Sequence, residues 1–214
     1  MTLPRPSAIF FDFDGVIVES TAIKTEAFST HYASHGPDVL AASIAHHEAH
    51  EGISRLIKFR HCHKVLLGIN LDDAALTELA RAYTAEVEDR VVACDGVSGA
   101  EDFFVRYHAQ IPLFVVSGTP EDELRRITDR RNLTRYFTQV RGSPATKDAI
   151  VMELLERHRL NAADTLFLGD AMTDYHAAVA CGVPFIGRVA PGRGNPFPGS
   201  VKVIEDLTTL RVIF

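Results

Sequence analysis

Short apolar runs alternate with stretches of helical periodicity along most of the chain. The first run, residues 9–11, suits a strand buried on both faces, as in a parallel sheet. Similar runs occupy residues 112–116, 136–140, 165–168 and 184–187, and the last is expected to begin a further strand–helix unit. The alternation predicts an α/β fold with a doubly wound parallel sheet, a Rossmann-like core with helices on both faces.

One long segment breaks this alternation, because residues 17–92 contain no convincing strand pattern. Helices are predicted from Ser20, across residues 38–68 and from Asp72. The segment therefore reads as an all-helical unit inserted after the first strand. The predicted division of the chain is a Rossmann-like core at residues 1–16 and 93–214, with the helical insertion at residues 17–92.

Composition narrows the classes of partner. The chain has 214 residues, 46% of them hydrophobic, and a formal net charge of −6. It has no basic run of the kind that follows a phosphate backbone, so neither nucleic acid nor an anionic membrane is an expected partner. No apolar stretch reaches 18 residues and residues 1–7 lack a signal-peptide pattern, which predicts a cytoplasmic protein. The oligomeric state is left open, and reduced thiols are expected at Cys62, Cys94 and Cys181.

Polar residues follow three of the predicted strands, at the carboxyl ends where open α/β sheets bind ligands. Asp12 and Asp14 come after the first strand, and the strand period of two lets both carboxylates leave on one side. Ser117 follows a second strand and Asp170 a third. These residues are therefore expected to meet at one edge of the sheet.

The turn after the second of these strands predicts an anion site. Thr119 is a good N-cap and Pro120 suits the first position of a helix, so the Ser117–Thr119 turn would present free backbone N–H groups, with Ser117 adding a hydroxyl. Lys147 lies at the start of a predicted helix, where the helix dipole does not favour a cation, which indicates another purpose.

Asp170 and Asp174 complete the set. Their i, i+4 spacing at a helix start lets both carboxylates face the strand ends. Any one of these features is compatible with simple capping or a solvated side chain. Their combination, in this order after separate strands, indicates a functional site.

On these residues the sequence resembles the haloacid dehalogenase-like superfamily of phosphotransferases, over nearly the whole chain. The matching phrases are Asp12-Phe-Asp14-Gly-Val, then Ser117, then Lys147 in Gly-Ser-Pro-Ala-Thr-Lys, and finally Gly-Asp170-Ala-Met-Thr-Asp174. The resemblance is to the capped phosphatases, which include phosphoglycolate phosphatase-like and beta-phosphoglucomutase-like members.

The resemblance implies a role for each of these residues. Asp12 would be the nucleophile that forms an aspartyl-phosphate, and Asp14 the acid that protonates the leaving oxygen and then activates water. Mg²⁺ would be held by Asp12, the backbone carbonyl of Asp14, and Asp170. The phosphoryl oxygens would bind Ser117, Gly118 and Lys147, with Asp174 positioning Lys147 or a metal-bound water.

The resemblance also implies that the helical insertion is a cap that excludes water and selects the substrate. Within it, Glu51-Gly-Ile-Ser-Arg55 is similar to the substrate-facing loop of capped sugar-phosphate phosphatases. Arg55 is therefore a candidate substrate contact, with a solvated helix-start arginine as the alternative. His46 and His50 share a helical face, but without a third ligand at matching spacing they are interpreted as surface or packing histidines.

The expected function is hydrolysis of a small phosphorylated metabolite by a Mg²⁺-dependent phosphatase, through an aspartyl-phosphate. Asp14 argues against dehalogenase and phosphonate-cleaving members, which lack an aspartate at that position. A phosphosugar mutase of the same superfamily is the main alternative. A receiver-like or catalytically inactive phosphate-binding protein is less favoured, and the identity of the phosphate ester is left open.

Overall fold

A computed structural model describes residues 1–213. At its centre is a six-stranded sheet with the order β4-β3-β2-β5-β6-β7, in which every neighbouring pair is parallel. The predicted α/β fold with a doubly wound, Rossmann-like parallel sheet is confirmed. The strands are β2 (Ala8–Phe11), β3 (Leu113–Pro120), β4 (Gln139–Ser143), β5 (Thr165–Gly169), β6 (Phe185–Arg188) and β7 (Lys202–Ile204).

Strand β2 shows why the sheet is covered on both faces. Ala8 and Phe10 belong to one buried apolar cluster, whereas Ile9 and Phe11 belong to the other. Successive side chains of a strand point to opposite faces, so a strand without polar positions needs a layer on each side. The helices that supply these layers are α5 (Ala100–Tyr107), α6 (Glu121–Arg130), α7 (Lys147–Arg157) and α8 (Met172–Ala180).

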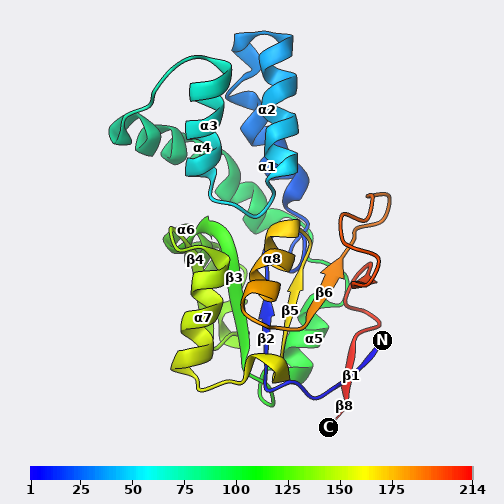
Figure 1. The fold of residues 1–214 in the computed structure, drawn as a ribbon. Helices are drawn as coiled ribbons and strands as arrows, with labels where there is room; N and C mark the ends of the chain where they lie inside the picture. Colours follow the sequence, from blue (N-terminus) through cyan, green and yellow to red (C-terminus); the bar gives the residue numbers. More distant parts are fainter. Residues whose placement is uncertain (214) are drawn as a thin grey trace.

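The long segment between β2 and α5 is helical, as its pattern predicts. Figure 1 shows its four helices together at one end of the molecule, beyond the end of the sheet where β2 and β5 finish. The chain enters this group at Thr21 and leaves it at Ala93, and it rejoins the sheet at β3, after α5. The helices are α1 (Thr21–Thr30), α2 (Pro37–Ala49), α3 (Arg55–Leu66) and α4 (Asp73–Ala93).

Two local predictions are wrong. Thr119 is not a helix N-cap: β3 continues through Pro120, pairs with Ser143 and leads directly into α6, whose N-cap residue is Pro120. β6 does not begin a strand–helix unit either. The segment after it, which the structure describes as far as residue 213, forms a loop and the short strands β7 and β8 (Arg211–Ile213), and β8 pairs in parallel with β1 (Thr2–Pro4). The prolines and glycines at residues 191–199 explain the loop, because they disfavour helix.

A search of the described residues found no helix long and apolar enough to cross a membrane.

Candidate active site

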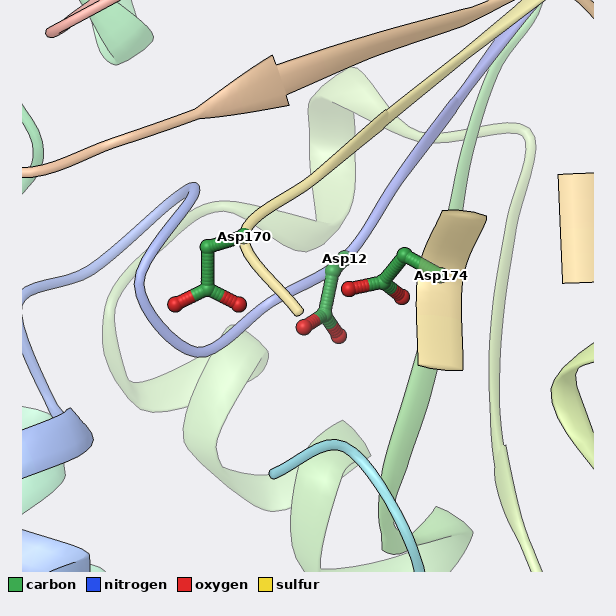
Figure 2. A group of neighbouring side chains, drawn as sticks. All are labelled: Asp12, Asp170 and Asp174. Carbon is green, nitrogen blue, oxygen red and sulfur yellow. The ribbon is translucent and has the colours of Figure 1, made fainter. Parts of the chain in front are cut away.

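Three carboxylates meet at the carboxyl end of the sheet. Asp12 follows β2, Asp170 follows β5, and Asp174 lies in the first turn of α8. One oxygen of each lies within 4.8 Å of the others, and Figure 2 shows the three carboxyl groups side by side. The predicted convergence of strand-end acids is therefore present in the structure.

Lys147 is the cation of this cluster. Its Nζ lies 2.6 Å from Asp174 Oδ1 and 3.0 Å from Asp12 Oδ1, and all three side chains are buried. Burial alone would lower the pKa of Lys147, but Asp12 and Asp174 outweigh it and raise that pKa. The lysine therefore stays charged, and its position at the start of α7 is explained by these two acids rather than by the helix dipole.

One ammonium does not neutralise three acids. Burial, followed by the charge of Asp174, raises the pKa of Asp12 to about 7 despite the nearby Lys147. Burial and the charges of Asp12 and Asp174 likewise raise the pKa of Asp170 well above its usual range. Asp12 Oδ1 also lacks a well-aligned hydrogen bond among the described residues, because Lys147 approaches it off-axis.

These observations fit a divalent cation. Carboxylate oxygens are the ligands that Mg²⁺ prefers, and a cation would relieve the repulsion that raises both pKa values. Among the described residues, Asp170 accepts no hydrogen bond and Asp12 is approached only by Lys147, so these two carboxylates are the ones available as metal ligands. Asp174 is already engaged, because Oδ1 accepts from Lys147 and Oδ2 accepts from the backbone N–H of Ala171 at 3.1 Å.

Asp14 belongs to a separate network. Its Oδ1 accepts from Ser20, and its Oδ2 accepts from Lys24 and, at 3.0 Å, from Thr119. Burial would raise the pKa of Asp14, but the Lys24 ammonium and the three hydrogen bonds together lower it. The two carboxylates that are adjacent in the sequence pattern thus have opposite pKa shifts, which suits different roles in proton transfer.

The predicted anion-binding turn is only partly as expected. Gly118 lines the cavity beside the carboxylates, but Ser117 and Lys147 do not. Ser117 is buried, and its Oγ accepts the backbone N–H of Thr119 at 3.1 Å. That N–H is therefore not free, because it is used inside the strand extension that replaces the predicted cap.

A cavity of about 60 Å³ lies between the sheet edge and the helical group. The loop between α2 and α3 contacts the core beside it: Thr173 Oγ1 donates to the carbonyl of Glu51 at 2.9 Å, and the backbone of Gly52 lies against Gly118. A Cβ on Gly118 would lie 2.3 Å from Gly52 O, so this approach requires glycine. The lining includes Asp12, Asp14 and Asp170 from the core and Lys24, His47, Arg55, Lys58 and Tyr83 from the helices.

Arg55 lines this cavity, but its guanidinium is already bound. Nη2 donates to Glu123 of α6 at 2.7 Å, Nη1 donates to Thr84 at 2.9 Å, and the group lies over the Tyr83 ring. Both Arg55 and Glu123 are buried. The alternative of a solvated arginine is therefore wrong. Arg55 links the helical group to the core through Glu123, and its contact with a substrate stays a prediction.

The structure brings three histidines of the helical group together. The ring of His46 lies 4.1 Å from that of His50 and stacks on His61 at 4.0 Å between centroids. Parallel stacking does not direct ring nitrogens at one point, and among the described residues the only acidic, histidine or cysteine group compact enough for a metal is the aspartate cluster. The packing interpretation of these histidines therefore agrees with the geometry.

Sequence reasoning missed three polar residues of the site, Lys24, Glu123 and Lys58, and gave Thr119 the role of a helix cap rather than that of a partner of Asp14. Lys24 and Thr119 hold Asp14, while Glu123 pairs with Arg55 and Lys58 lines the cavity. The three missed residues lie in helices whose pattern is typical of an ordinary surface, and they reach the site only through tertiary packing. The apolar spacing of α1 and α3 gives no signal for them.

Comparisons with known proteins agree with this geometry. The chain is 25% identical to the phosphoglycolate phosphatase of Pseudomonas fluorescens, over 96% of this chain and 78% of that one. The structure resembles CbbY from Rhodobacter sphaeroides in complex with xylulose-(1,5)bisphosphate, with a TM-score of 0.73, 16% identity and 97% of both chains covered. It also resembles YfnB from Bacillus subtilis bound to magnesium, with a TM-score of 0.69, 16% identity and coverage of 95% of this chain and 96% of that one.

The fold and the site define an enzyme of the hydrolase class, built on a Rossmann-like sheet with its acids at the carboxyl edge. A model of haloacid dehalogenase-like hydrolases matches residues 9–188. The chain belongs to the haloacid dehalogenase-like hydrolase family, which confirms the resemblance read from the motifs and disfavours the receiver-like alternative.

Proposed function

We propose that this enzyme is a Mg²⁺-dependent phosphatase that hydrolyses a small phosphorylated metabolite through an aspartyl-phosphate on Asp12. The observation that carries the proposal is the buried Asp12 carboxylate, which lies 3.0 Å from the Lys147 ammonium and beside Asp170 at the cavity. The similarity to phosphoglycolate phosphatases supports the same reaction class.

In the first half-reaction, a carboxylate oxygen of Asp12 attacks phosphorus as the bond from phosphorus to the ester oxygen breaks. The leaving oxygen takes a proton from Asp14. Lys147 faces the same carboxylate and opposes the negative charge on the phosphoryl oxygens, with Ser117 and Gly118 as further proposed contacts. A Mg²⁺ ion held by Asp12, Asp170 and the carbonyl of Asp14 would supply additional positive charge at the transferring group.

In the second half-reaction, the Asp14 carboxylate takes a proton from water while the water oxygen attacks phosphorus. The bond between Asp12 and phosphorus breaks, which releases phosphate and restores Asp12. The lowered pKa of Asp14 favours the ionised form that this base role requires. In the acid role, Asp14 must be protonated, which requires the Lys24 ammonium to withdraw or the charge of a bound substrate to offset it.

The helical group at residues 17–92 is, in this proposal, a cap that closes over the substrate, with the remainder of the chain as the catalytic core. The Arg55–Glu123 pair and the Glu51–Thr173 hydrogen bond would stabilise the closed arrangement.

The test is hydrolysis of p-nitrophenyl phosphate with and without Mg²⁺. Asp12→Asn is expected to lower the rate by about 10³-fold or more, because an amide oxygen is a poor nucleophile. The matched control is Asp122→Asn, at an exposed position on α6, which is expected to retain full activity. Full activity of Asp12→Asn would exclude the proposed nucleophile. Interconversion of sugar phosphates that requires a bisphosphate activator would instead identify a mutase.

A further inference from the structure

The cations at this site differ in how they are paired. Lys147 binds Asp12 and Asp174, Lys24 binds Asp14, and Arg55 binds Glu123. Each of these ammonium or guanidinium groups therefore has a carboxylate of the protein as its counter-charge, as buried cations require.

Lys58 is the exception. It lies on α3 with 4% of its surface exposed, and it lines the cavity opposite the strand ends. Within the part of the chain that the structure describes, no carboxylate lies within 4.0 Å of its ammonium. Glu51, which also lines the cavity, is paired with Arg193 at 3.0 Å.

Among the described residues, the hydrogen-bond partners of this ammonium are two uncharged atoms of His47. Lys58 Nζ donates to the His47 carbonyl at 3.2 Å and lies 3.5 Å from His47 Nδ1. Burial, and then the charge of Lys58 itself, lowers the pKa of His47 to about 3, so the ring is neutral. An ammonium has three donors, so at least one is left for a group inside the cavity.

A buried ammonium without a counter-charge is costly for folding and is expected where a ligand supplies the charge. The transferred phosphoryl group already has Lys147 on the core side. A second anionic group, carried on the part of the substrate that faces the helices, would complete the pairing at Lys58. His47 leaves one donor of the singly charged ammonium, which matches the single charge of a carboxylate better than the double charge of a second phosphate.

We propose that Lys58 is a specificity-determining residue that binds the carboxylate of a short phosphorylated acid, while the opposite wall of the cavity holds the phosphoryl group. This inference rests on the proposed phosphatase function. It adds the substrate class: a phosphate ester that carries a carboxylate at the end facing the helices.

The experiment compares three substrates with the same two-carbon chain, 2-phosphoglycolate, 2-hydroxyethyl phosphate and ethylene glycol bisphosphate. Their far ends carry a carboxylate, a hydroxyl and a second phosphate. For the unmodified enzyme, kcat/KM is expected to be highest for the carboxylate. In Lys58→Met, the ratio of kcat/KM for the acid to that for the alcohol is expected to fall about 10- to 100-fold, as for loss of a charge-assisted hydrogen bond.

Two further variants separate recognition from folding. Lys58→Arg keeps the charge and is expected to recover part of the preference for the acid. Lys64→Met removes an exposed lysine from the same helix and is expected to leave the ratio unchanged. An unchanged ratio in Lys58→Met would overturn the assignment of Lys58. A preference of the unmodified enzyme for the bisphosphate would overturn the assignment of a carboxylate as the second anionic group of the substrate.

These outcomes are distinct from failure of the proposed function. If the unmodified enzyme hydrolyses none of the three esters and no p-nitrophenyl phosphate with Mg²⁺, the phosphatase proposal itself fails. If it hydrolyses them without a difference between acid and alcohol, the phosphatase proposal stands and the specificity proposal fails.

Discussion

The two walls of the cavity handle charge in different ways. On the core wall, the ammonium of Lys147 lies within 3.0 Å of oxygens of Asp12 and Asp174, so it fixes the two carboxylates relative to each other. Asp12 lines the cavity itself, whereas Lys147 and Asp174 do not. On the wall formed by the helices, Lys58 is held through atoms of His47 that carry no charge. The carboxylates at the core wall lack one cation for charge balance. The Lys58 ammonium at the helical wall lacks a carboxylate partner among the described residues.

This difference indicates a division of labour. In the proposed mechanism, the core groups face the transferring phosphoryl group and so act in a step common to all phosphate monoesters. In the same proposal, the helical group faces the part of the substrate to which the phosphoryl group is attached. A change in the core wall should therefore affect every substrate, whereas a change in the helical wall should alter the choice among substrates.

The largest effect is expected for Lys147→Met. It would leave Asp12 and Asp174 buried without a cation, and removing one partner of a buried ion pair costs about 3–5 kcal/mol of unfolding free energy. Loss of the charge opposite the phosphoryl group should also lower kcat/KM about 10²- to 10³-fold for every ester. Urea unfolding and steady-state kinetics measure the two effects.

The matched control is Lys202→Met, at an exposed position on β7, which should alter neither quantity. Addition of Mg²⁺ should recover part of the stability lost in Lys147→Met, because the ion supplies positive charge to the same acids. A variant with the stability of the unmodified enzyme would contradict the charge balance described for the core wall.

Replacement of Lys58 is expected to change the free energy of unfolding less than Lys147→Met does, and to increase it rather than decrease it. Burial, and then the like charge of Lys24, lowers the pKa of Lys58 to about 7 in the folded protein, despite Glu51 and Asp14. Between pH 7 and the ordinary lysine pKa of 10.5, the unfolded chain binds more protons than the folded one, so stability rises with pH across that window. Below pH 7 the full cost of burying the ammonium is present.

Lys58→Met lacks this cost. It should therefore be more stable than the unmodified protein at about pH 6, by on the order of a few kcal/mol, with the difference shrinking as pH approaches about 10. Urea midpoints at several pH values measure this difference, and exposed Lys64→Met should show none of it. A stability difference that is independent of pH would show that Lys58 is not a buried, uncompensated cation.

The sequence predicts the core wall far better than the helical wall, for a physical reason. Asp12, Asp170 and Lys147 lie where strands end or helices begin, and parallel strands bring such positions to one edge whatever the details of packing. Lys58 and Lys24 lie within helices, and their direction depends on how α1 and α3 pack against the core. Periodicity identifies helices but does not fix their mutual orientation.

The wrong local predictions have the same origin. The Ser-Gly-Thr-Pro phrase suits a helix cap, but pairing with β4 extends β3 through it and leaves Thr119 free to bind Asp14. Tertiary pairing thus overrides a local capping preference at the position where the site needs a hydroxyl. The segment after β6 has no helix because its prolines and glycines disfavour one, although the alternation of the preceding units suggests it.

The smallest effect on kcat/KM is expected where the two walls meet, at the contact between Gly118 and the backbone of Gly52. In Gly118→Ala, the added Cβ would lie 2.3 Å from Gly52 O, a backbone atom that must move away. Gly118 lies in β3 without a left-handed φ, so the strand itself accepts alanine and the cost falls on closure of the loop between α2 and α3. A decrease in kcat/KM of about 10-fold for all esters is expected, with little change in the urea midpoint, because water exclusion weakens while the core stays packed. Gly194→Ala is the control, since nothing lies within 4 Å of its added Cβ. If Gly118→Ala lowered kcat/KM for 2-phosphoglycolate alone, the contact between Gly118 and Gly52 would contribute to substrate recognition. Gly118 would then belong with the residues that select the substrate.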